Sequence, residues 1–165
     1  MKVSCSAALI LCFASMSSAV LAEECLLNQE YFHGEAQALV RRHAGAKYIG
    51  DERLVRWDSS DLGRISVIVG GCESFGLESS SERRVIKPSS REAVLKIAKR
   101  LARLGWPEPY GREAESVLST KPRVEGRKSG GLAFEYDAPD YMEFAVSQSF
   151  DGTVEKITVS AIHLQ

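Results

Sequence analysis

The chain has 165 residues, of which 44% are hydrophobic and 26% are charged, and its formal net charge at pH 7 is −1. A chain of this length is expected to form one domain with a self-sufficient hydrophobic core. The small acidic excess excludes a general nucleic-acid-binding protein, because such proteins normally carry a large basic excess.

The first 22 residues have the pattern of a secretory signal peptide. Lys2 precedes an apolar run from Ala7 to Ala14, and small residues then lead to Ala22. A basic start, a short apolar core and a small-residue cleavage site are the three parts of such a signal. The apolar run is shorter than a bilayer-spanning helix requires. We therefore expect cleavage near Ala22, a periplasmic or secreted protein, and no membrane span.

Two cysteines, Cys25 and Cys72, lie beyond the expected cleavage site. A single pair in an oxidising compartment has only one possible connectivity, so we expect a Cys25–Cys72 disulfide. It would tie the start of the exported chain to the middle of the domain. In the chain-entropy model, closing a loop of this length stabilises the fold by about 4 kcal/mol.

The N-terminal half predicts one short helix followed by a β-hairpin. Residues 35–44 place small and aliphatic side chains on one stripe, which indicates a helix. Residues 53–58 and 64–70 have strand-like composition and flank a polar, glycine-ended turn at 59–63. This region is therefore expected to contribute two antiparallel strands.

Residues 90–104 form the clearest predicted helix. Ser89 and Glu92 match the capping-box pattern at its start. Its apolar residues fall on one stripe and its lysines and arginines on the opposite side, as in a helix that lies on a sheet. The neighbouring serine runs, 79–81 and 89–90, are interpreted as loop or cap residues.

Residues 106–131 are polar and rich in glycine and proline, and they predict a long irregular segment. Connections of this length are usually functional or mobile. Arginines and aromatic residues, enriched at protein interfaces, occur together here. The predicted partner-binding residues are Trp106, Tyr110, Lys121, Arg123, Arg127 and Lys128.

The last third of the chain predicts a three-stranded meander. Asp151-Gly152 between two alternating runs is a strong signal for a two-residue hairpin turn. Such a turn places Gln148 opposite Glu155 and aligns the apolar residues of both strands on one face. Residues 132–137 add a third strand whose apolar side chains join that face.

Together these elements predict a single α+β domain over residues 23–165. Its mainly antiparallel sheet is expected to consist of the N-terminal hairpin and the C-terminal meander. One long amphipathic helix, residues 90–104, is the predicted cover for the apolar face of this sheet.

Patterns for catalysis are weak. The three histidines, His33, His43 and His163, have no metal-ligand spacing. Cys72, which follows two glycines, is the best candidate nucleophile, but a thiolate there is incompatible with the expected disulfide. We therefore predict no enzymatic activity, no cofactor and no metal site. A small periplasmic hydrolase is the alternative.

These features favour an exported, non-catalytic binding protein of the cell envelope, which engages another protein through a sheet edge or through residues 106–131. In size, signal and cysteine pair, the chain resembles small exported bacterial antagonists, such as lysozyme inhibitors and periplasmic immunity proteins. The resemblance includes no sequence motif, and it implies an inhibitor or antagonist. A structural or accessory envelope subunit is a further alternative, and the sequence does not define the oligomeric state.

Overall fold

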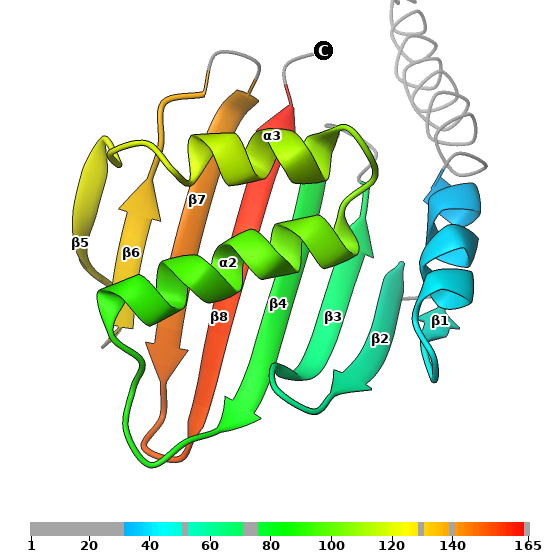
Figure 1. Cartoon of the computed structure of the whole chain (residues 1–165), viewed down its shortest axis with the longest axis horizontal. Helices are drawn as coiled ribbons and strands as arrows, with labels where there is room; N and C mark the ends of the chain where they lie inside the picture. Colours follow the sequence, from blue (N-terminus) through cyan, green and yellow to red (C-terminus); the bar gives the residue numbers. More distant parts are fainter. Residues whose placement is uncertain (1–31, 51–52, 71–75, 129–130, 139–140, 164–165) are drawn as a thin grey trace, which may run out of the picture.

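The computed structural model describes residues 32–50, 53–70, 76–128, 131–138 and 141–163. They form one eight-stranded antiparallel sheet with the order β1-β2-β3-β4-β8-β7-β6-β5. The strands are β1 Lys47–Ile49, β2 Leu54–Ser59, β3 Gly63–Val69, β4 Gly76–Arg84, β5 Val124–Lys128, β6 Gly131–Glu135, β7 Tyr141–Phe150 and β8 Val154–His163. The first four strands form one half of the sheet and the last four the other, and the halves meet where β4 pairs with β8 (Figure 1).

The described helices leave one face of the sheet uncovered. Helix α2, Arg91–Gly105, crosses the strands, and α3, Tyr110–Val117, lies beside it on the same face (Figure 1). A further helix over residues 32–42 lies near β1 and contributes Phe32, Ala36 and Leu39 to the core. The hydrophobic core therefore lies between this set of helices and one side of the sheet.

This architecture corrects the predicted fold class. One eight-stranded sheet replaces the predicted sheet of a hairpin plus a three-stranded meander, and three short helices in the described part of the chain replace the single long cover. The predicted loop serines 79–81 lie inside β4, and the segment 106–131 contains α3 and β5. Neither strand has the apolar alternation that identifies a strand, because β4 turns serines toward the helices and β5 is an edge strand.

The helix predicted over 90–104 is confirmed as α2, although its cap differs. Its predicted apolar stripe is buried, with Val94, Ala98 and Leu101 fully inaccessible. The cap is Ser90, whose side chain accepts a hydrogen bond from the Ala93 N–H at 3.4 Å. The neighbouring serine, interpreted from the sequence as the cap, instead takes part in a buried polar cluster described below.

The last hairpin keeps its predicted faces but not its predicted register. Gln148 pairs with Ile157, whereas a two-residue turn would pair it with Glu155. Asp151 explains the difference, because its Oδ1 accepts a hydrogen bond from the Val154 N–H at 2.8 Å and lengthens the connection. The shift is two residues, and side chains alternate with a period of two, so the inward-facing set is unchanged.

Candidate partner-binding surface

Trp106 and Tyr110, the two aromatic residues of the predicted patch, pack toward the core. Trp106 is 1% exposed and packs edge-on against Phe144, with ring centroids 5.8 Å apart. Tyr110 is half-buried on α3 and also packs against the core. The composition of the segment does not reveal this burial, because a tryptophan in a polar stretch looks the same whether it anchors the core or a partner.

The basic residues of the patch lie in or just before the edge strand β5: Lys121, Arg123, Arg127 and Lys128. Arg123 binds two carboxylates, Glu135 at 2.9 Å and Asp137 at 3.1 Å. Lys121 and Arg127 are exposed, and the side chain of Lys128 lies outside the described residues. The surface of this segment is therefore less basic than its sequence suggests, because Glu135 and Asp137 neutralise the charge of Arg123.

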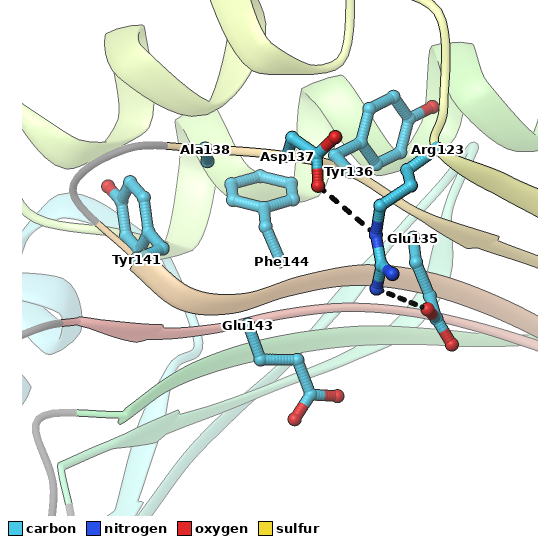
Figure 2. Close-up of a pocket in the computed structure, with 8 residues that line it drawn as sticks. All are labelled: Arg123, Glu135, Tyr136, Asp137, Ala138, Tyr141, Glu143 and Phe144. Carbon is cyan, nitrogen blue, oxygen red and sulfur yellow. Dashed lines mark hydrogen bonds and ion pairs between the residues drawn. The ribbon is translucent and has the colours of Figure 1, made fainter.

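A hollow of about 750 Å³ lies beside Arg123, where β6 and β7 diverge (Figure 2). Its core side is formed by aromatic rings, and the hydroxyl of Tyr141 donates a hydrogen bond to Glu113 of α3 at 3.0 Å. Figure 2 shows Glu143 pointing to the other side of β7, away from this cluster. Because Arg123 binds both carboxylates near it, the described residues of the hollow contain no free acid–base pair.

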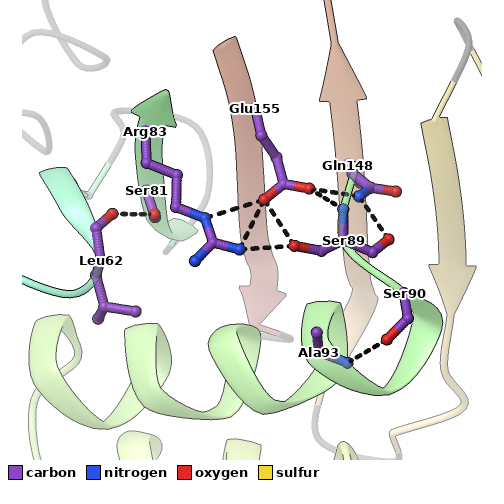
Figure 3. Close-up of polar contacts among 8 residues, drawn as sticks. All are labelled: Leu62, Ser81, Arg83, Ser89, Ser90, Ala93, Gln148 and Glu155. Atoms are coloured by element: carbon purple, nitrogen blue, oxygen red, sulfur yellow. Dashed lines mark hydrogen bonds and ion pairs between the residues drawn. The ribbon is translucent and has the colours of Figure 1, made fainter. Parts of the chain in front are cut away.

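A buried carboxylate, Glu155, lies between the sheet and the start of α2 (Figure 3). Its Oε2 accepts hydrogen bonds from Arg83 Nε at 3.0 Å, Arg83 Nη2 at 2.8 Å and Ser89 Oγ at 2.9 Å. Its Oε1 accepts from the Ser89 N–H at 2.6 Å and from Gln148 Nε2 at 2.7 Å. Burial alone would raise the pKa of Glu155, but these hydrogen bonds outweigh it, and the pKa is lowered. With all its lone pairs engaged, Glu155 anchors the helix to the sheet.

The two described histidine side chains make packing contacts. His43 stacks on Trp57, with ring centroids 4.3 Å apart, and its Nε2 lies 3.0 Å from the carbonyl oxygen of Leu104. His33 packs edge-on against Tyr48 at 5.5 Å. Both rings therefore help hold the N-terminal helix region against the domain.

The expected signal peptide and disulfide fall outside the described residues, as do Cys25, Cys72 and the side chain of His163. The signal peptide and the Cys25–Cys72 disulfide therefore remain predictions from the sequence. Within the described ranges, no group of three His, Cys, Asp or Glu side chains could hold a metal ion. None of the helices in that part of the chain is long and apolar enough to cross a bilayer.

The sheet face opposite the helices, called the open face below, carries short polar side chains at its centre. A row of hydroxyls crosses four neighbouring strands through the directly paired residues Ser66, Ser80, Thr158 and Ser147. The adjacent row alternates in charge through Asp58, Arg64, Glu82 and Lys156. Side chains along a strand alternate between faces, so these rows point away from the core.

A second hollow, of about 380 Å³, indents one end of the open face. It is lined by Ile68 and Ile162 and by the carboxylates Glu78 and Glu143. Ile68 is 38% exposed although β3 is an interior strand. Neither glutamate has an ion-pair or hydrogen-bond partner among the described side chains. This hollow, called the acidic hollow below, therefore combines an apolar floor with two available negative charges.

No protein-family model matches the chain, and no curated protein or solved structure is significantly similar to it. Its function is therefore inferred from the chemistry of its surfaces. Two stand out in the described part of the chain: the open face with its acidic hollow, and the edge at β5.

Proposed function

We propose that this protein is an exported, non-catalytic binding protein that engages another protein through the open face. The observation that carries the proposal is that the described helices cover only one face of the eight-stranded sheet (Figure 1). The open face is broad, and its central row consists of short hydroxyl side chains, of which Ser147 is exposed, Ser66 and Thr158 are half-buried and Ser80 is buried. Short side chains of this kind allow a partner to approach closely, and an exposed hydroxyl both donates and accepts hydrogen bonds. Export is supported by the signal-like pattern of residues 1–22.

The acidic hollow indicates the chemistry of the partner. The aliphatic stem of a lysine or arginine fits against Ile68 and Ile162, while its charged end reaches Glu78 or Glu143. Complementary charge of this kind steers association and excludes acidic partners. The proposed partner is therefore a protein with a basic surface, whose activity is blocked when the open face covers it.

The test compares the wild-type protein with two charge reversals, each purified from an exporting host and used to capture envelope proteins. Glu143→Lys reverses a charge in the acidic hollow, and Glu92→Lys makes the same change on an exposed position of α2. We expect the wild type and Glu92→Lys to retain one basic protein equally, and Glu143→Lys to bind it about tenfold more weakly, a change of about 1.4 kcal/mol.

The captured protein is then titrated against the three purified forms by calorimetry. Equal affinity for all three would place the binding surface elsewhere. Capture of no protein, or of an acidic one, would contradict the proposal itself.

A further inference from the structure

Strand β5 lies at one edge of the sheet. It pairs only with β6, and no described helix lies beyond it (Figure 1). The opposite edge, β1, has only three residues and lies beside the helix over 32–42. An edge strand presents a row of unpaired N–H and C=O groups, which can pair with a strand from another chain.

The sequence of β5 is complementary to itself about Gly126. When two copies of Val124–Lys128 run antiparallel with Gly126 opposite Gly126, Glu125 of each copy faces Arg127 of the other. Opposite charges placed directly across an antiparallel pair are stabilising, whereas like charges are destabilising. A two-fold axis repeats every contact, so this register forms two favourable Glu–Arg pairs.

Both charged side chains lie on the helix-covered side of the sheet, because their partners on β6 are Phe134 and Leu132. Arg91 of α2 already binds the Glu125 carboxylate, at 2.8 and 3.1 Å, and so holds it at the edge. Arg127 is exposed and has no ion-pair or hydrogen-bond partner among the described residues. The carboxylate is thus positioned to accept a second guanidinium from another copy.

The centre of the strand allows another backbone to approach. A Cβ atom placed on Gly126 would meet no atom within 4 Å. A glycine inside a strand often marks a point of close backbone approach. The absence of a side chain at the two-fold axis therefore suits a strand pair centred on this residue.

From these contacts we infer that a second copy of this chain pairs with β5 and forms a two-fold dimer with one continuous sheet. The dimer extends the open face across both copies, and the inference does not depend on the proposed partner. An interface of one short strand is small, so association is expected at the weak end of the range for specific complexes.

Sedimentation velocity over concentrations up to about 1 mM tests this dimer. In a dimer of the Arg127→Glu variant, Glu125 of each copy faces a glutamate of the other copy. In a dimer of the Glu125→Arg variant, Arg127 of each copy faces an arginine of the other copy. Each variant alone is expected to dimerise at least about tenfold more weakly than the wild type. An equimolar mixture of the two should form a heterodimer more tightly than either variant forms a homodimer, because every cross-strand pair is then Glu–Arg.

Lys121→Glu is the matched control, since it makes the same charge change at an exposed position outside β5. It should leave dimerisation unchanged, as should Arg127→Lys. If Glu125→Arg fails to fold, the contrast between Arg127→Lys and Arg127→Glu decides the question. A monomer at every concentration, a dimer unaffected by Arg127→Glu, or an equal loss in Lys121→Glu would each overturn the inference.

Discussion

The helix-covered face and the open face of the sheet both carry charged side chains and hydroxyls. On the covered face, the Glu155 carboxylate is 0% exposed and its partners all come from the same chain. On the open face, Glu78 and Glu143 line a hollow and have no described partner. Burial makes an unpaired polar group costly, so polar groups under the helices serve the fold. On the open face, Glu78 and Glu143 remain available to a partner.

The largest expected effect comes from breaking the covered cluster. Glu155→Ala removes the carboxylate partner of the partly buried Arg83 guanidinium and leaves the Ser89 N–H without its acceptor. The Arg83 Nη2 and the Gln148 amide keep hydrogen bonds only to Ser89, through its Oγ and its carbonyl oxygen. Removing one member of a buried ion pair costs about 3–5 kcal/mol. Urea unfolding should show this loss, whereas Glu82→Ala on the open face should change stability by less than about 0.5 kcal/mol. Similar losses for both would remove the distinction between the faces.

The same carboxylate should give the fold a pH dependence. The pKa of Glu155 is lowered in the folded state from its ordinary value of 4.5. Its contribution to stability is therefore complete above that value and is lost as pH falls through the lower, folded-state pKa. We expect the free energy of unfolding to fall more steeply for the wild type than for Glu155→Gln on acidification below about pH 4.5. Parallel curves would show that this group does not couple to folding.

A smaller effect is expected where α2 meets β4. A Cβ added at Gly105 would lie 2.6 Å from Val67 Cγ2 and would also clash with the Ser79 hydroxyl. Overpacking of this kind costs about 1–3 kcal/mol. The control is Gly34→Ala, where an added Cβ meets nothing within 4 Å and no loss is expected. Thermal unfolding of both variants measures the difference in stability. Equal stability would mean that the side chains around Gly105 move aside for the added Cβ at no cost.

The smallest expected effect separates two buried serines of one strand. Ser81 Oγ donates a hydrogen bond to the Leu62 carbonyl oxygen, whereas Ser79 Oγ has no partner among the described residues. Ser81→Ala should cost about 1 kcal/mol, while Ser79→Ala should be neutral or stabilising. The midpoint of denaturant unfolding measures each change in stability, provided that the slope of the transition is the same as in the wild type. A larger loss for Ser79→Ala would show that its hydroxyl is satisfied.

Only part of the candidate site was accessible from the sequence. The polar positions of β7 and β8, which supply Ser147 and Thr158 to the hydroxyl row of the open face, follow from the alternation of the last hairpin, and the structure confirms their side of the sheet. Ser80 and Glu78 were not recognised, because a serine-rich strand has the composition of a loop. The pairing of Arg123 with Asp137 was also not predictable, since it depends on how two separate segments meet at the sheet edge.

The amphipathic helix α2, the first hairpin and the faces of β7 and β8 could be predicted from the sequence, because each depends on a local pattern of side chains. The signal-like pattern of the N-terminus is local in the same way. The pairing of β4 with β8, the edge position of β5 and the face that the described helices leave uncovered are seen only in the tertiary structure. Those features depend on contacts between residues far apart in the chain. Residues 76–84 form strand β4 because β3 and β8 on either side complete their backbone hydrogen bonds. The serine-rich side chains of this segment do not by themselves indicate a strand.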